Sequence, residues 1–464
     1  MSIRLPLAAR IVTVAVLPVL TACVKPPPGD RTDTLRAALR GGHARNVILF
    51  IGDGMGDSEI TMARNYHVGA AGRLALDSLP LTGTVTTYAV TEDNPTRPDY
   101  VVDSAASATA WATGHKTSNR RLSTAPGSGA PLETILELAQ KQGYATGNVT
   151  TAELTDATAA ALGAHVNHRN CQGPTNMASC PHHAKAAGGP GSIAEQLVDH
   201  HIDVLLGGGR QRFDQVIDFG PYKGQTVIQS AVAQGYTVVT NRAELQTTRP
   251  GEKVLGLFAP AEMSPEWTGE PARAMPGSGP QRCVEHQRPE SQPSLADMTR
   301  VALHLLDAVA DEGLFLQVEG ALIDKAAHLA YPCQQLGETV AFDAAVAVGL
   351  EYLANHPDTL VIVTADHGHS SQLVDPPTDT DHSPGVYSTL ITREGAPMTI
   401  SYATNVPGRP QEHTGIPVRI AAQGPQAGNV VGVIDQTDVF RIIAGALGIE
   451  LPLPVEGQPS PSDL

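Results

Sequence analysis

Helical and extended patterns alternate along most of the chain, and this alternation limits the folds available to it. Helices predicted at 131–143, 192–201, 294–310 and 338–355 are each followed by an apolar segment, at 144–150, 202–209, 314–320 and 359–366. Repeated helix–strand units build a mostly parallel sheet with helices on both faces. The sequence therefore predicts an α/β fold with a doubly wound sheet, in which ligands collect at the carboxyl ends of the strands.

The main domain is predicted over residues 46–450, and it opens with a buried strand at 46–51. Two regions interrupt the helix–strand alternation. Residues 210–293 are rich in proline and glycine, and residues 371–412, which include "DPPTDTDHSPG", predict a small inserted subdomain or lid. The tail at 451–464 has the composition of a disordered end.

The N-terminus is predicted to be a targeting segment. Arg4 and Arg10 flank an apolar stretch, Ile11–Leu20, that is too short to span a bilayer. "LTAC" at residues 20–23 resembles the lipobox of bacterial lipoproteins, so residues 1–22 would be removed and Cys23 acylated. Residues 24–45, which begin "VKPPPGD", then read as a proline-rich tether or arm. The protein would be exported and anchored to a membrane, facing the periplasm or the cell exterior; an ordinary secretory signal with an incidental cysteine is the alternative.

Four cysteines remain once Cys23 is set aside, and an exported chain can pair them in two disulfides. Closeness in sequence favours Cys171 with Cys180, which leaves Cys283 with Cys333, although four cysteines allow three pairings. Neither close pair has the CxxC spacing of a zinc finger.

The charge balance argues against nucleic acid as a partner. The chain carries 31 basic and 47 acidic residues, a net charge of −16, which repels polyanions unless bound cations reverse the sign locally.

Carboxylates stand at the ends of three predicted strands. These are Asp53 in "IGDGMGD", Glu319 in "LFLQVEG" and Asp366, with His367, in "VIVTADHGH". Carboxylates gathered at one sheet edge would repel one another, so they indicate bound cations. Taken singly, each could simply serve a turn.

Further metal-ligand residues lie in two other segments. Asp324 and His328 share a face if "EGALIDKAAHLA" is helical, and "QEHTG" adds His413. Two imidazoles and a carboxylate suit zinc. His369 is expected to support a ligand rather than to bind metal. Four other histidines are expected to be solvated or satisfied: His182, His183, His200 and His201.

Ser104, in "DYVVDSAASATAW", begins a run of small helix-forming residues. Serine and aspartate are both common helix N-caps, so this stretch fits either a cap or a nucleophile placed at a helix start.

Taken together, the motifs resemble those of the alkaline phosphatase family, in its bacterial periplasmic form, from about Asn46 to Ile449. "IGDGMGDSEIT", "DSAASATAW", "TAELTDAT", "QVEGALIDK", "VTADHGHSSQ" and "QEHTG" occur in the family's order. The resemblance implies that Ser104 is the nucleophile and that 371–412 is a crown-like insertion. It further implies one zinc ion held by Asp324, His328 and His413, and a second held by Asp53, Asp366, His367 and Ser104.

The same resemblance implies a magnesium site, where Asp53 bridges, Thr158 and Glu319 ligate, and Asp156 orients water. Arg169 would bind two phosphate oxygens with Asp103 holding its guanidinium, and Lys325 would contact phosphate through water. Some family branches carry histidine at the positions of Asp156 and Lys325; the oxygen-rich set here favours magnesium over a third zinc.

These residues predict hydrolysis of phosphate monoesters through a phosphoserine, with inorganic phosphate as product. A homodimer is possible, because family members commonly embrace a partner with an N-terminal arm. The alternatives are a phosphodiesterase, a sulfatase, which would need a modified Cys or Ser in a CxPxR context, and a lipoprotein that binds phosphate or metal without turnover.

Overall fold

A computed structural model describes residues 30–376, 384–406 and 409–451. The predicted signal peptide, Cys23, residues 24–29 of the tether and the tail from residue 452 lie outside the described residues. Among the described residues, no helix combines the length and the apolar composition that a membrane span requires.

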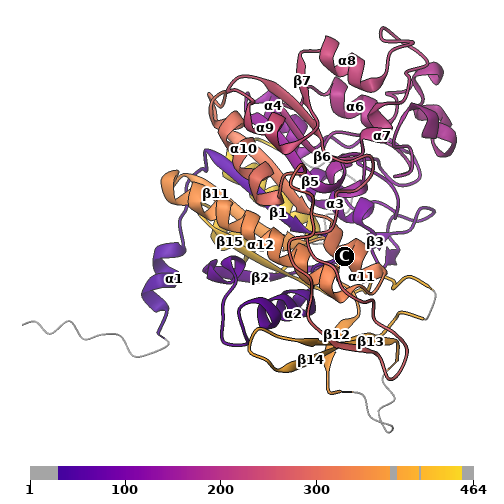
Figure 1. The fold of residues 1–464 in the computed structure, drawn as a ribbon. Coiled ribbons are helices and arrows are strands. Elements are labelled where there is room, and N and C mark those ends of the chain that lie inside the picture. The colour runs from indigo at the N-terminus through magenta and orange to yellow at the C-terminus, as the bar shows by residue number, and fades with distance from the viewer. Residues whose placement is uncertain (1–29, 377–383, 407–408, 452–464) are drawn as a thin grey trace, which may run out of the picture.

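A ten-stranded sheet forms the centre of the molecule, in the order β16-β2-β15-β11-β1-β10-β5-β6-β8-β7 (Figure 1). Its strands are β1 (Asn46–Gly52), β2 (Leu81–Thr86), β5 (Ala145–Glu153), β6 (Val204–Gly208), β7 (Tyr236–Val239), β8 (Lys253–Leu257), β10 (Leu314–Gly320), β11 (Thr359–Ala365), β15 (Val418–Gln423) and β16 (Gly432–Asp435). Within this sheet the described strand β15 alone runs antiparallel to its neighbours. The mostly parallel sheet predicted from the sequence is confirmed.

Apolar strands explain the burial at the sheet centre. Every residue of β1, β5, β10 and β11 is buried, because helices cover both faces of the sheet. In Figure 1, α10 (Leu295–Asp307) and α12 (Pro332–Asn355) lie across one face. Helices α3 (Ser104–Thr113), α4 (Ile135–Lys141) and α13 (Gln436–Leu447) pack against one another in a separate layer.

The remaining helices are short or lie at the edges of these layers. They are α1 (Thr32–Ala38), α2 (Asp57–His67), α5 (Ala157–Ala160), α6 (Ile193–Asp199), α7 (Arg210–Phe213), α8 (Val227–Ala233), α9 (Arg242–Gln246), α11 (Leu322–His328), and the 3-10 segments η1 (Ala75–Ser78), η2 (Pro174–Ser179), η3 (Pro181–His183), η4 (Lys185–Ala187) and η5 (Ala427–Val430). Helix α1 extends away from the body in Figure 1 and buries none of its residues.

A second, four-stranded sheet lies apart from the main one, at the bottom of Figure 1. Its order is β12 (Ser371–Val374), β14 (Pro397–Tyr402), β13 (Val386–Ile391), β9 (Ser278–Gln281). A two-stranded ribbon pairs β3 (Ala89–Val90) with β4 (Pro98–Asp99). The second sheet thus joins strands from 371–402 to one strand from 278–281.

The interruption expected at 210–293 is partly wrong. Strands β7 and β8 lie in this region and extend the parallel sheet to its edge. The intervening helices α8 and α9 have only 7 and 5 residues, too few to give a clear helical period.

Both disulfides of the favoured pairing are present in the structure. Cys171 bonds to Cys180, and Cys283 bonds to Cys333.

Candidate active site

Three adjacent strands end at one level and place their carboxylates together. Gly52 of β1 is in register with Gly320 of β10 and Ala365 of β11. Asp53 and Asp366 are therefore the first residues beyond neighbouring strands, and Glu319 precedes Gly320. All three carboxylate residues are buried.

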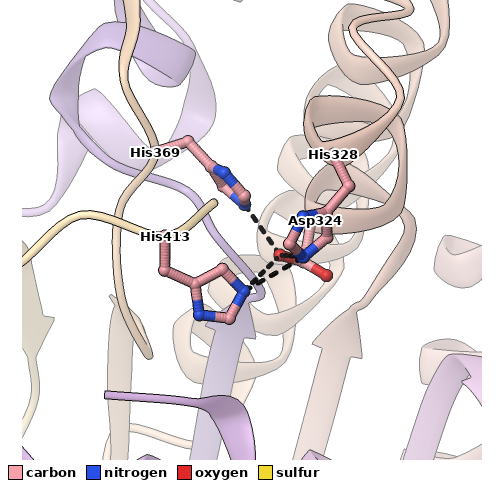
Figure 2. A group of neighbouring side chains, drawn as sticks. All are labelled: Asp324, His328, His369 and His413. Atoms are coloured by element: carbon pink, nitrogen blue, oxygen red, sulfur yellow. Dashed lines mark hydrogen bonds and ion pairs between the residues drawn. The ribbon is translucent and has the colours of Figure 1, made fainter. Parts of the chain in front are cut away.

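Helix α11 follows β10 directly and adds two ligand side chains to this edge. Asp324 Oδ1 lies 3.2 Å from His328 Nε2, 3.4 Å from His413 Nε2 and 2.7 Å from His369 Nε2 (Figure 2). The two nitrogens Nε2 of His328 and His413 are 3.0 Å apart. The structure thus gathers Asp324, His328 and His413, as the resemblance implies, with His369 against the aspartate.

Backbone carbonyls orient two of these imidazoles. Val102 O lies 3.0 Å from His413 Nδ1, and Gln411 O makes a close contact with His328 Nδ1. A carbonyl can only accept, so each Nδ1 carries the proton and each Nε2 presents its lone pair to the centre. This is the tautomer that a zinc-binding histidine needs.

His367 joins Ser104 to the strand-end carboxylates. Its Nε2 lies 3.3 Å from Ser104 Oγ, 3.2 Å from Asp366 Oδ2 and 3.5 Å from Asp53 Oδ1. The other oxygen of Asp366 accepts 2.8 Å hydrogen bonds from the backbone amides of Gly54 and His367. The second expected zinc set therefore also meets at one point.

Asp103, rather than Ser104, caps helix α3. Asp103 is the N-cap residue, and its Oδ1 accepts a 3.0 Å hydrogen bond from the Ala106 amide. The structure therefore excludes the N-cap role that the sequence left open for Ser104. The buried Ser104 hydroxyl, at the first helical position, instead faces His367.

Oxygen atoms dominate the third group, beside Asp53. Glu319 Oε2 accepts a 2.6 Å hydrogen bond from Thr150, and the hydroxyl of Thr158 is buried. Asp156 is the N-cap of the short helix α5, and Thr158 is the second residue of that helix. Hydroxyl and carboxylate oxygens are the ligands of a hard cation such as Mg²⁺.

Several buried polar atoms of these groups lack hydrogen-bond partners among the described residues. The oxygens among them are Asp53 Oδ1, Asp366 Oδ2 and Thr158 Oγ1. Burial, together with repulsion from Asp324 and Asp366, raises the pKa of Asp53 well above its ordinary value. Burial raises the pKa of Glu319 to about 8 and that of Asp366 to about 6. Bound cations would satisfy these oxygens and favour their ionised forms, so the residues fit a multi-metal centre.

Basic side chains lie next to the centre and share one carboxylate. Asp156 binds Arg169 Nη2 through Oδ1 at 2.8 Å and Lys325 Nζ through Oδ2 at 2.9 Å. Asp103 Oδ2 lies 3.4 Å from Arg169 Nη1. The charge of Asp156 raises the pKa of Lys325. For Arg169, burial lowers the pKa, but the carboxylates of Asp156, Asp103 and Asp53 together outweigh burial, and the pKa rises. Both groups are cationic, as binding of an oxyanion requires.

Sequence reasoning missed the supports of these side chains. Examples are the carbonyls of Val102 and Gln411, and the direct pairing of Asp156 with both basic residues. Every residue has a backbone carbonyl, so the sequence does not indicate which carbonyls contact a histidine. The Thr150–Glu319 contact had one usable signal, since both residues lie at the ends of predicted strands; that these strands are neighbours is known only from the structure.

The fold and this centre define an α/β metalloenzyme with a serine set among metal-ligand side chains. The model of the family described as alkaline phosphatase matches residues 44–406 and 394–449. The streptomycin-6-phosphate phosphatase of Streptomyces griseus is 56% identical over 414 residues, covering 88% of this chain and 91% of the relative. The alkaline phosphatase of Escherichia coli K12 is 48% identical, covering 91% of this chain and 90% of the relative. The solved alkaline phosphatase of Thermus thermophilus shares the fold, with a TM-score of 0.65 at 24% identity over 92% of this chain and 96% of that one.

The chain belongs to the alkaline phosphatase family. It is a metal-dependent phosphatase that acts on phosphate monoesters.

Proposed function

We propose that the protein hydrolyses phosphate monoesters through a phosphoserine on Ser104, with two Zn²⁺ and one Mg²⁺ bound. One observation carries this proposal: the buried Ser104 Oγ lies 3.3 Å from His367 Nε2, among carboxylates with unpartnered oxygens. A hydroxyl in that position can be deprotonated and attack phosphorus.

The three ions are assigned by ligand chemistry. One zinc takes Asp324, His328 and His413, and the other takes Asp53, Asp366, His367 and Ser104, because imidazole and carboxylate suit zinc. Magnesium takes the oxygens of Asp53, Thr158 and Glu319, with Asp156 orienting water. Zn²⁺ supplies Lewis-acid chemistry that acidifies a hydroxyl at neutral pH and stabilises a leaving alkoxide.

The chain's own residues bind and orient the substrate. Arg169 donates two parallel hydrogen bonds to non-bridging phosphate oxygens, and Asp103 and Asp156 hold its guanidinium in place. Lys325 adds positive charge and reaches the phosphoryl group through water. Ser104 Oγ attacks phosphorus, the alcohol leaves with the bridging oxygen, and water then cleaves the phosphoserine to release inorganic phosphate.

The test compares wild type with Ser104→Ala on p-nitrophenyl phosphate, before and after EDTA and after zinc plus magnesium are returned. We expect Ser104→Ala to lose at least about 10³-fold in kcat, because the nucleophile is removed. EDTA should abolish wild-type activity, and the metals should restore it. Equal rates for the two proteins would overturn the serine mechanism.

A bis-ester assayed in parallel separates monoesterase from diesterase. Arg169 favours the monoester, since it grips two non-bridging oxygens of a terminal phosphate. A faster bis-ester rate would favour the diesterase instead. If the protein binds phosphate and metals but hydrolyses neither ester, it is a binding protein without catalytic activity.

A streptomycin phosphate ester is a second candidate substrate. The relative from Streptomyces griseus carries that name. A cleft of about 430 Å³ is lined among others by Asp99, Asn119, Arg120 and His168, the residue that precedes Arg169. Its polar lining suits a hydroxyl-rich alcohol. We would compare kcat/KM for streptomycin 6-phosphate and p-nitrophenyl phosphate; a preference above tenfold for the former supports this substrate, and equal values exclude it.

Export and anchoring are a separate proposal for the N-terminus. Residues 1–22 would be a signal peptide, Cys23 the lipidated residue and residues 24–45 a tether, supported by the lipobox-like "LTAC". Cys23→Ser should release active enzyme from the membrane fraction, since the acyl chains are lost. Retention of the variant in membranes would contradict this assignment.

We propose a catalytic domain at 46–450 with 371–412 as its insertion, and a homodimer formed through the arm. Helix α1 buries no residue within one chain, and Leu39 beside it is 59% exposed, which supports contact with a second copy. Sedimentation of the enzyme with and without residues 24–40 tests the dimer; an unchanged mass would exclude the arm.

A further inference from the structure

Glu137, His165 and His200 form a group of metal-ligand side chains outside the active site. Their ligand atoms all lie within 4.8 Å of one another. Glu137 lies in the first turn of α4, His165 lies beyond α5, and His200 directly follows α6. The sequence predicts that His200 is solvated or satisfied; in the structure its side chain is 23% exposed, and its Nδ1 faces the carboxylate of Glu137.

Both imidazoles point at the same oxygen of Glu137. Oε1 lies 3.1 Å from His165 Nε2 and 3.4 Å from His200 Nδ1. In a tetrahedral site with zinc bonds of about 2.0–2.1 Å, neighbouring ligand atoms are about 3.3 Å apart. The distances from Glu137 Oε1 to the two imidazole nitrogens are therefore close to those between neighbouring ligand atoms of a bound zinc ion.

Hydrogen bonds with neighbouring backbone groups orient His165 and Glu137 so that each presents one free ligand atom to the site. His165 Nδ1 lies 2.8 Å from the Ser123 carbonyl, which can only accept, so this nitrogen carries the proton and Nε2 presents its lone pair to Glu137. A lone pair facing a carboxylate requires a cation, either a proton or a metal ion, between them. Glu137 Oε2 accepts a 2.8 Å hydrogen bond from the Thr134 amide, which leaves Oε1 for that cation.

We propose that Glu137, His165 and His200 bind one divalent ion of the zinc class, with water in the fourth position. The three side chains are 12–23% exposed, so water and the ion can reach the site. Two neutral imidazoles and one carboxylate match the ligand types that such ions prefer.

The ion would join three elements near the phosphate-binding arginine. It would link α4 and the end of α6 to the segment that runs from His165 to Arg169. Val166 pairs with Leu122 in a β-bridge, and the Arg169 amide donates a 2.7 Å hydrogen bond to Arg120 O. The site is thus structural, and none of its three residues belongs to the catalytic machinery.

The first test counts metal ions in the full-length enzyme. Wild type, His200→Gln and the control His304→Gln, an exposed histidine of α10, are dialysed against buffered free zinc with magnesium and analysed for bound metal. We expect wild type and His304→Gln to hold one more zinc per chain than His200→Gln. Phosphatase activity should be unchanged in all three, so the lost ion is not a catalytic one.

The second test needs no variant. Crystals of zinc-loaded wild type, with data collected on both sides of the zinc absorption edge, should show an anomalous peak between Glu137, His165 and His200, besides the peaks at the active site. Equal zinc content in the three proteins overturns the proposal. So does a map that shows the active-site peaks and none at this group, and this decides the matter even if His200→Gln does not fold.

Discussion

Asp103 connects the start of helix α3 with the arginine that is proposed to bind phosphate. One oxygen accepts from the Ala106 amide, and the other contacts the Arg120 amide at 3.0 Å and Arg169 at 3.4 Å. A single carboxylate therefore positions the first residue of α3, Ser104, and the guanidinium opposite it. The two roles of Asp103 can be tested separately, because one substitution can remove its charge and keep the helix cap, whereas another removes both.

Asp103→Asn should weaken phosphate binding while keeping the cap, because asparagine caps helices about as well as aspartate. We expect the inhibition constant of inorganic phosphate to rise about fivefold, equivalent to about 1 kcal/mol for a partly exposed ion pair. Asp103→Ala should show the same rise and also lose about 1 kcal/mol of unfolding free energy. Phosphate inhibition and urea denaturation measure the two effects; an unchanged inhibition constant in Asp103→Asn would refute the role of its charge.

Gly54 lies close to His369, which contacts the ligand Asp324, and to the backbone of Asp324 itself. Its φ is +68°, and a Cβ there would lie 2.7 Å from His369 Cδ2 and 3.1 Å from Asp324 Cα. Gly54→Ala should therefore displace the His369 side chain and the Asp324 backbone, and lower zinc affinity by about 10–100-fold, the usual effect of disturbing a group that orients a ligand.

The matched control is Gly235→Ala. Gly235 also has a positive φ, +93°, but nothing lies within 4 Å of its Cβ position. We expect Gly235→Ala to lower the free energy of unfolding about as much as Gly54→Ala does, but to bind zinc like the wild type. Zinc retention against a competing chelator measures the difference, and equal retention by both variants would show that the contact with His369 is unimportant.

At the level of elements, the two disulfides brace different parts of the fold. Cys171–Cys180 closes the segment that follows Arg169, with a sequence separation of 9, whereas Cys283–Cys333 ties the start of α12 to the chain beyond β9, with a separation of 50. The chain-entropy model assigns about 3 kcal/mol to the short loop and about 4 kcal/mol to the long one.

We therefore expect one double serine variant to change mainly in KM and the other mainly in thermal stability. Cys171→Ser with Cys180→Ser should raise KM several-fold, because Arg169 lies two residues from Cys171. Cys283→Ser with Cys333→Ser should lose more thermal stability and keep KM near wild type. Melting curves and steady-state kinetics on the same preparations test both; a larger KM change in the second variant would contradict this division.

The elements that sequence reasoning predicted are those with long, uniform patterns. β1 and β11 are apolar throughout, because both faces of these parallel strands are buried. β7, with an exposed Thr237, and β9, which contains Gly279 and Pro280, lack that pattern, and β9 also lacks a partner nearby in the sequence. β9 pairs with β13, more than a hundred residues away, and such a pairing depends on the tertiary fold. Likewise the ligand types at strand ends were predictable, but the carbonyls that orient His328 and His413 were not.

For the molecule as a whole, the active site concentrates negative charge in a chain whose net charge is already −16. Asp53, Glu319 and Asp366 are buried at one sheet edge, and their pKa values are raised in the metal-free protein. The structure thus stores an electrostatic penalty that bound cations would relieve, which couples metal content to stability.

This coupling predicts a pH-dependent loss of stability on metal removal. With its pKa raised to about 8, Glu319 in the folded metal-free protein holds a proton that the unfolded chain has already released near pH 4. The unfolded state then binds fewer protons, so stability falls as pH rises toward 8. Burial also raises the pKa of Glu59 to about 8, and Glu59 lies outside the metal centre, so both forms should share part of this decline.

The difference in melting temperature between metal-free and metal-loaded enzyme reports on the metal centre, because the effect of Glu59 is common to both forms. His367, whose pKa is lowered by burial, acts in the opposite sense below about pH 6.5, so the informative window is about pH 6.5–8. Across this window the melting temperature of EDTA-treated enzyme should fall more steeply than that of enzyme with zinc and magnesium, so the gap widens with pH. Scanning calorimetry of both forms measures it. A constant gap would mean that these carboxylates stay ionised without metal, and that cations do not offset their burial.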